Sequence, residues 1–248
     1  MSNKPYKGFE PKWLLTPAPA GSYRSIFRWG DPAFFKYPKE SLYKMMKEAF
    51  HMTDEDFRDY TDDIGFDQVS LPDHPSRIAP EHLEALKKIV GKEFVTTGDY
   101  ERLSVAYGCT GYDLLRLRHK QIDSLPDVVV YPDTTEQVEE LVHYAAEHKL
   151  PLYVYGGGSS VTRGVEPIKG GISLDMRKRF NKILSFNEVD QTITVQAGLS
   201  GPALEEALQD APNCFGAKRQ YTCGHFPQSF EYSSVGGWVV TRGAGQNS

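Results

Sequence analysis

Residues 126–160 read PDVVVYPDTTEQVEELVHYAAEHKLPLYVYGGGSS, and most of the predicted architecture follows from this segment. Val128–Tyr131 is a short apolar β-branched run, which is typical of a strand buried on both faces. A helix should follow, because Thr134 and Gln137 match a capping box ahead of an apolar stripe. Leu152–Tyr155 predicts a second buried strand. Strand, helix and strand in this order make a βαβ unit, whose crossover we expect to be right-handed.

The second predicted strand runs directly into a glycine triplet, Gly156–Gly158, followed by Ser159 and Ser160. Without Cβ atoms in the way, several backbone N–H groups can converge there on one anion, and the two hydroxyls add donors. We interpret this loop as a pyrophosphate cradle that a side chain on Gly157 would block; a flexible turn is the alternative. No Gly-Lys-Ser/Thr follows, and Val161 stands where G-x-G-x-x-G has its third glycine, so P-loop and classical NAD binding lose support.

A second segment rich in glycine and serine runs from Gly224 to Ser248. Within it, Val235–Thr241 is apolar and opens with two glycines, which favours a short helix. The N-terminus of such a helix would present N–H groups and a positive dipole end to phosphate. A tight packing motif made of small residues is the alternative interpretation.

The remaining patterns predict an α+β fold with three parts. Residues 1–22 read as a flexible N-terminal arm, and residues 23–125 as a helical region with helices in Ser41–Tyr60 and Pro80–Val90. Residues 126–248 form the predicted ligand-binding domain. After the βαβ unit it continues with alternating strands at 172–176 and 193–197, and with a helix that starts at Ser200.

Composition narrows the class of protein. The chain has 248 residues, 40% of them hydrophobic and 25% charged, as in ordinary globular proteins, and its net charge of −5 disfavours nucleic acid as a partner. No apolar stretch approaches the roughly 18 residues of a membrane span. Three cysteines fit a reducing compartment. We therefore predict a cytoplasmic protein without a transmembrane segment and leave peripheral contact with a membrane surface open.

The order of these segments resembles the FAD-binding (PCMH-type) domain of the vanillyl-alcohol-oxidase superfamily. The resemblance rests on Pro126–Tyr131, the glycine loop, Ser173–Asp175, Thr194–Gly198 and Gly224–Gly245. Within this superfamily, GHFPQSFEYS followed by GGW and TR is similar to the alkylglycerone-phosphate synthase branch. Arg28-Trp29-Gly30 and Tyr107–Arg118 resemble the helical lead-in of the same branch.

The resemblance implies a βαβ subdomain plus a mixed or antiparallel subdomain, and FAD as the cofactor. Some family members bind the flavin covalently through a histidine or cysteine in or near these loops; because Ser159 and Ser160 follow the glycine triplet here, we predict non-covalent FAD. Carried over residue by residue, it places on the cofactor Val154, Tyr155, Gly156, Gly157, Gly158, Ser159, Ser160, Gln228, Ser229, Phe230, Glu231, Tyr232, Ser233, Ser234, Thr241, Arg242, Gly243 and Ala244. We interpret His225 as a structural residue. Cys214, Cys223 and His225 lack zinc-site spacing, so we expect no metal. The segment Asp210–Cys223 is longer than the resemblance predicts.

The implied activity is that of a transferase in ether-lipid synthesis, which exchanges the acyl chain of acyl-dihydroxyacetone phosphate for a fatty alcohol. An FAD-dependent oxidoreductase that passes hydride from a hydroxy acid or alcohol to flavin N5 is the first alternative, and a non-catalytic FAD-binding module is the second. In the family the substrate-binding half lies C-terminal, so we expect a chain truncated at Ser248 and assign no catalytic residue. The expected partners are FAD and a small-molecule or lipid substrate, with a homodimer left open.

Overall fold

The computed structural model describes residues 18–26, 40–57 and 65–243, and the chain divides into two compact units. The first unit comprises Met1–Val69 and Leu115–Gln121, and the second comprises Ser70–Leu114 and Ile122–Ser248. Most of the predicted arm and the whole of Arg28-Trp29-Gly30 lie outside the described residues.

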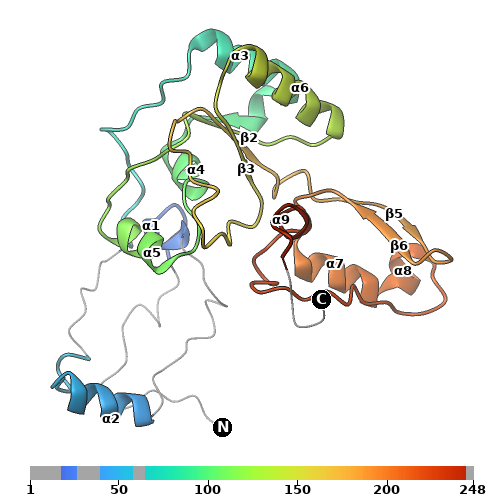
Figure 1. Ribbon diagram of the computed structural model, residues 1–248. Helices are drawn as coiled ribbons and strands as arrows, with labels where there is room; N and C mark the ends of the chain where they lie inside the picture. Colours follow the sequence, from blue (N-terminus) through green and yellow to red (C-terminus); the bar gives the residue numbers. More distant parts are fainter. Residues whose placement is uncertain (1–17, 27–39, 58–64, 244–248) are drawn as a thin grey trace. The chain divides into compact units, whose positions relative to one another are not determined.

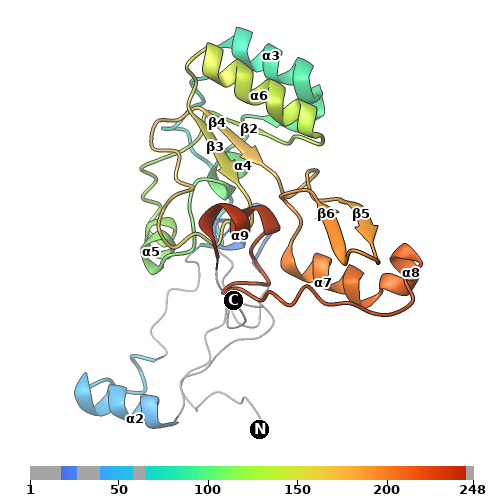
Figure 2. The ribbon, with the colours of Figure 1, turned by 45° about the vertical axis from the view of Figure 1, so that its right-hand side comes forward.

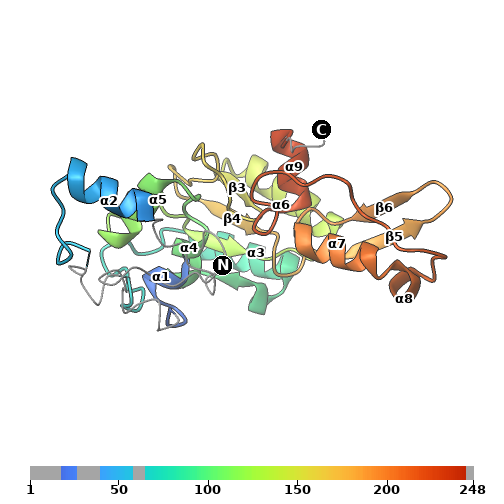
Figure 3. The same ribbon diagram turned by 90° about the horizontal axis from the view of Figure 1, so that it is seen from below.

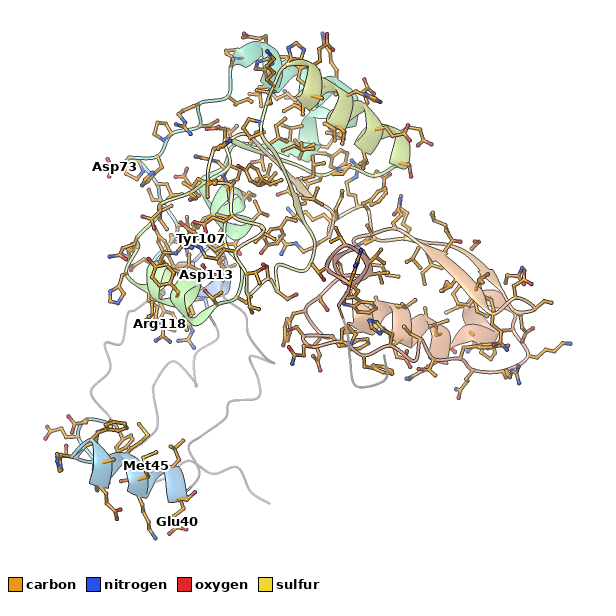
Figure 4. The ribbon with its side chains drawn as sticks, viewed as in Figure 1. Glu40, Met45, Asp73, Tyr107, Asp113 and Arg118 are labelled. Atoms are coloured by element: carbon orange, nitrogen blue, oxygen red, sulfur yellow. The ribbon has the colours of Figure 1, made fainter. Side chains whose placement is uncertain are left out.

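The first unit contains α1 (Tyr23–Ile26) and α2 (Glu40–Ala49), which carries Glu40 and Met45 in Figure 4. Helix α2 confirms the helix predicted from the spacing of Leu42, Met45 and Phe50. None of its side chains is buried in the part of the chain that the structure describes. Helix α5 (Gly111–Arg118) spans the boundary between the two units.

The second unit is built on a mixed four-stranded sheet (Figure 1) in the order β1-β2-β4-β3. Its strands are β1 (Val95–Thr96), β2 (Val128–Val130), β3 (Leu152–Tyr155) and β4 (Ile172–Asp175). β1 pairs antiparallel with β2, whereas β2, β4 and β3 are parallel. The predicted β-α-β succession is present, but β4 lies between its two strands. Because β3 is therefore at the edge of the sheet, Val154 is 56% exposed and the prediction of a second buried strand was wrong.

One face of the sheet is covered by α3 (Pro80–Val90) and α6 (Thr135–Glu147), which lie side by side in Figures 1 and 2. Their contact with the sheet forms the main core, made of Leu86, Val90, Val95, Val128, Val130, Leu141, Ala145, Ile172, Leu174 and Met176. The predicted cap of α6 is present, because the Thr134 hydroxyl accepts the Gln137 N–H at 3.3 Å. The Gln137 side chain accepts in return from the backbone N–H of Asp133, just before the cap, at 2.8 Å.

The opposite face of the sheet carries a smaller cluster of Val105, Val129, Tyr131 and Tyr155. Val105 directly follows α4 (Asp99–Ser104), and the one-turn helix η2 (Lys92–Phe94) supplies Phe94 at the rim of this cluster. Tyr131 and Tyr155 are the residues at the carboxyl ends of the parallel strands β2 and β3. Ligands of open α/β sheets bind at this end of the strands.

A hairpin of β5 (Ile183–Asn187) and β6 (Thr192–Val195) forms the second sheet (Figure 3). The same part of the chain contains the helices α7 (Gly201–Gln209), α8 (Ala211–Phe215) and α9 (Val235–Thr241). Its core contains Leu199, Leu204, Leu208 and Trp238. Helices α7 and α9 confirm the predictions from Ser200 and Val235–Thr241, and β6 confirms a predicted strand. Strand β5 was not predicted. Mixed sheet and hairpin together confirm the α+β class.

Candidate functional site

The glycine loop and the segment before α9 are far apart in sequence but in direct contact. A Cβ atom added to Gly156 would overlap the Ser234 hydroxyl oxygen, and one added to Gly157 would overlap the Tyr232 carbonyl oxygen. The Cβ positions of these two glycines thus point into protein, not toward open space for a ligand. The expectation that a side chain on Gly157 would itself block the pyrophosphate is wrong for this reason: the glycines allow the two loops to touch.

Backbone donors of the glycine loop are available to a ligand. The N–H groups of residues 157–160 donate to no acceptor within the described part of the chain, and neither do the half-buried hydroxyls of Ser159 and Ser160. Successive unengaged N–H groups with neighbouring hydroxyls are the donor set that binds a phosphate or pyrophosphate group. The residues present therefore fit the pyrophosphate of a dinucleotide.

The N-terminus of α9 does not offer free N–H groups. The N–H of Val235 donates to the Leu199 carbonyl at 2.9 Å, and that of Gly236 donates to the Ala197 carbonyl at 2.9 Å. The N–H of Gly237 donates to the hydroxyl of the N-cap Ser234 at 3.4 Å. The expectation of exposed helix donors was wrong, because neighbouring groups already satisfy them. The packing alternative describes this segment.

The remaining predicted residues before α9 form a tight turn. Ser229 has a positive φ of 62°, and its carbonyl accepts the N–H groups of Tyr232 and Ser233 at 2.8 and 2.9 Å. The Ser233 hydroxyl accepts the indole N–H of Trp238 at 2.6 Å. Phe230 packs against the same indole ring, with centroids 5.8 Å apart, while Gln228 and Glu231 are exposed. Ser233 and Ser234 are buried and bonded within the protein.

The predicted residues after α9 lie at its C-terminal end. The Thr241 hydroxyl donates to the Gly237 carbonyl at 2.7 Å, and Arg242 adopts a left-handed conformation with φ of 51°. The N–H of Gly243 donates to the Trp238 carbonyl at 2.8 Å. Ala244 lies outside the described residues.

Arg177 follows β4 and contacts Tyr155, the residue before the glycine loop. Arg177 donates to Asp175 through two nitrogens at 2.8 and 2.6 Å, and its guanidinium carbon lies 4.6 Å from the centroid of the Tyr155 ring. Burial opposes the charge of Arg177, but its hydrogen bonds with Asp175 outweigh burial and raise its pKa. Burial also raises the pKa of Tyr155 to about 12, so this hydroxyl remains a donor at neutral pH.

His225 contacts the edge of Trp238, with ring centroids 5.6 Å apart, which supports its interpretation as a structural residue. The Cys223 thiol lies 3.7 Å from the His225 carbonyl oxygen, and Cys214 is exposed near Asp210. Within residues 18–26, 40–57 and 65–243, no group of three or more His, Cys, Asp or Glu side chains is arranged to hold a metal ion. No helix in these ranges is long and apolar enough to cross a membrane.

The unexpectedly long segment Asp210–Cys223 packs on the β5–β6 hairpin. Phe215 stacks on Phe186 with centroids 4.8 Å apart, and Glu188 accepts the Lys218 N–H at 2.7 Å and the Tyr221 hydroxyl at 3.0 Å. An open depression of about 610 Å³ beside this segment is lined by Gln191, Glu205, Gln209, Arg219, Gln220, Tyr221 and Thr222. It shares no residue with the predicted FAD site.

The contact of the glycine loop with residues 107–109 was not predicted. The backbone N–H of Cys109 donates to the Ser160 carbonyl at 2.8 Å, and Tyr107, labelled in Figure 4, accepts a hydrogen bond from Tyr155. The only sequence signal for this segment was the likeness of Tyr107–Arg118 to the family's lead-in, which says nothing about contact with the loop.

Comparison with known proteins agrees with this geometry. Residues 126–248 match the FAD binding domain family. The chain is 33% identical over 177 residues to an alkyldihydroxyacetonephosphate synthase of Dictyostelium discoideum, covering 70% of this chain and 28% of that protein. It is 26% identical over 168 residues to D-lactate dehydrogenase [cytochrome] 1 of Saccharomyces cerevisiae, covering 67% of this chain and 26% of that protein.

A solved alkyldihydroxyacetonephosphate synthase superposes with a TM-score of 0.64 at 32% identity, covering 69% of this chain and 33% of the other. The chain thus spans a third or less of the length of these synthases. Residues 126–248, with the three parallel strands β2, β4 and β3, the hairpin and the glycine loop, therefore form a PCMH-type FAD-binding domain, and the chain belongs to the flavoproteins that carry it.

Proposed function

We propose that this chain is the FAD-binding portion of an alkyldihydroxyacetonephosphate synthase-like enzyme. Alkyldihydroxyacetonephosphate synthase is another name for alkylglycerone-phosphate synthase. The observation that carries the proposal is the glycine loop, whose N–H groups at residues 157–160 are unengaged in the described part of the chain. The likeness to synthases at about one-third identity supports the choice of branch.

In this proposal the chain binds and orients the cofactor and contributes no catalytic residue. The N–H groups of residues 157–160 and the hydroxyls of Ser159 and Ser160 would hold the FAD pyrophosphate. When bound, FAD supplies the reactive centre at flavin N5. The lack of a histidine or cysteine in residues 156–160 supports non-covalent binding.

The proposed overall reaction replaces the acyl chain of acyl-dihydroxyacetone phosphate with a fatty alcohol, which would place the protein in ether-lipid synthesis. A hydroxy-acid oxidoreductase is the second candidate, because a D-lactate dehydrogenase matches 67% of the chain. The two differ in outcome: the first releases a fatty acid without net redox change, whereas the second reduces an electron acceptor.

The first experiment is an absorption spectrum of the purified chain with added FAD, taken after gel filtration and again on the supernatant after acid precipitation. Flavin bands that survive filtration and pass into the acid supernatant support non-covalent FAD. A colourless protein contradicts the proposal and favours the non-catalytic alternative. If flavin is retained, two activities are then measured on the longest polypeptide that carries these residues. They are the exchange of the acyl chain for a fatty alcohol and the reduction of an electron acceptor.

A further inference from the structure

The glycine loop is held at both ends by one short segment that precedes the family-matched domain. This segment, Tyr107–Cys109, lies between α4 and α5, upstream of Pro126, where the matched region begins. It belongs to the same compact unit as the loop. The contacts therefore join two parts of one unit.

At the start of the loop the connection is the side chain of Tyr155. Its hydroxyl donates to the Tyr107 carbonyl at 3.4 Å, and its ring is buried. Gly158 has a positive φ of 71°, and a Cβ atom on it would overlap the same hydroxyl. The Tyr155 ring thus lies directly against the middle of the loop, between Gly158 and the carbonyl of Tyr107.

At the end of the loop the connection is backbone to backbone. The Cys109 N–H donates to the Ser160 carbonyl at 2.8 Å. A Cβ atom on Gly108 would overlap that carbonyl oxygen, so the approach requires glycine at this position. The segment itself is tied to the chain that enters β2, because the Tyr107 hydroxyl accepts the N–H groups of Asp123 and Ser124 at 3.0 and 3.3 Å.

We propose that Tyr107–Cys109 is a positioning element of the FAD site, which fixes both ends of the glycine loop so that its free N–H groups are preorganised for the pyrophosphate. Donors that are fixed before the ligand arrives avoid the ordering cost that a flexible loop would incur on binding. Tyr155 and Gly108 are the positioning residues: neither needs to touch the cofactor through its side chain. This inference rests on the proposed function.

The test compares two variants with two matched controls. Tyr155→Phe removes the hydroxyl that reaches Tyr107, and Gly108→Ala forces Ser160 away. Tyr153→Phe is the control for the first, since it removes a hydroxyl of the same strand that accepts the Lys169 N–H at 3.2 Å. Gly111→Ala is the control for the second, because an added Cβ there meets nothing within 4 Å.

The readouts are the dissociation constants of FAD and of ADP, which carries a pyrophosphate without the flavin, and the exchange rate of the Cys109 amide in the protein without ligand. We expect Tyr155→Phe to weaken both ligands by roughly threefold to tenfold and Gly108→Ala by about tenfold or more. The Cys109 amide should exchange faster in both variants. The controls should match the unmodified chain in all three measurements.

Unchanged affinities together with unchanged Cys109 exchange in a folded Tyr155→Phe variant would overturn the inference. If Gly108→Ala does not fold, Tyr155→Phe decides alone. Failure of the unmodified chain to bind FAD overturns the proposed function instead, and amide exchange then still decides whether Tyr107–Cys109 fixes the loop. The two failures are therefore distinguishable.

Discussion

The carbonyl oxygen of Tyr232 occupies the position that a Cβ atom on Gly157 would need. This contact brings the glycine loop against the turn before α9 without any intervening side chain. The two segments that resemblance assigned to FAD therefore support one another, and the glycine that touches Tyr232 is needed whether or not a ligand is present.

Gly157→Ala should separate the two segments and weaken FAD binding. The added methyl group forces the loop or Tyr232 to move, and overpacking of this kind costs about 1 to 3 kcal/mol. We expect a lower midpoint of urea unfolding and a higher dissociation constant for FAD. Gly164→Ala is the control, because its nearest contact would be Thr162 at 3.9 Å. Equal stability of both variants would contradict the packing role of Gly157.

Ser160→Ala should weaken FAD without changing stability. The Ser160 hydroxyl has no partner among the described residues, so its removal leaves the folded protein intact and deletes one donor to the pyrophosphate. The expected loss is about 0.5 to 1.5 kcal/mol of binding free energy, measured by titration calorimetry. The exposed Ser185 offers a control serine on β5. An affinity equal to that of the unmodified chain would remove Ser160 from the site.

Glu205 should make stability depend on acid pH. Burial alone would raise its pKa, but hydrogen bonds from the Cys223 backbone N–H and from the Thr222 and Gln209 side chains outweigh burial and lower it. Because the pKa is lowered in the folded protein, Glu205 stabilises the fold fully above its pKa in the unfolded chain, which is about 4.3. This stabilisation is lost as the pH falls through the pKa of Glu205 in the folded protein.

Glu205→Gln should therefore reduce the free energy of unfolding by about 1 to 2 kcal/mol at pH 7, because an amide has one acceptor where the carboxylate has two. The difference from the unmodified chain should shrink at acid pH, as the pH falls through the lowered pKa of the native carboxylate. Urea unfolding at neutral and at acid pH measures this, with the exposed Glu206→Gln as control. A constant difference across the pH range would count against the role of the carboxylate charge.

Cys109 and Cys214 should differ in reactivity. Burial, with a smaller contribution from Asp113, raises the pKa of the Cys109 thiol to about 11, whereas Cys214 is exposed. Since the thiolate is the reactive form, iodoacetamide at pH 8 should modify Cys214 first and leave Cys109 unmodified. Cys109 should react progressively as pH approaches 11, as followed by peptide mass spectrometry. Rapid modification of Cys109 at pH 8 would contradict its burial beside the loop.

Local patterns in the sequence predicted the elements that depend on neighbouring residues. The capping pair Thr134 and Gln137 located α6, and the apolar run at 128–130 located a strand buried on both faces. The position of β4 between β2 and β3 could not be predicted this way, because strand order depends on contacts between distant segments. The exposure of Val154 at the sheet edge follows from that order.

The candidate site likewise has features that local sequence predicts and features that depend on distant residues. Glycines and serines identified the loop at 156–160 and the segment before α9, since small residues are a local signal. Which groups remain free is not local: the N–H groups of Val235 and Gly236 are satisfied by carbonyls of residues 199 and 197. The contribution of Gly108 was also missed, because α5, β2, α6 and β3 separate it from its partner Ser160 along the chain.

Strand order also constrains how the chain assembles during synthesis. Because β4 lies between β2 and β3, these two strands expose unpaired edges toward each other until Ile172–Asp175 emerges from the ribosome. Unpaired strand edges are sites of aggregation. By then Tyr107–Cys109 has long been available to hold the glycine loop, whereas Tyr232–Ser234 is still to be made. The upstream partner of the loop is therefore synthesised before the loop, and the downstream partner after it.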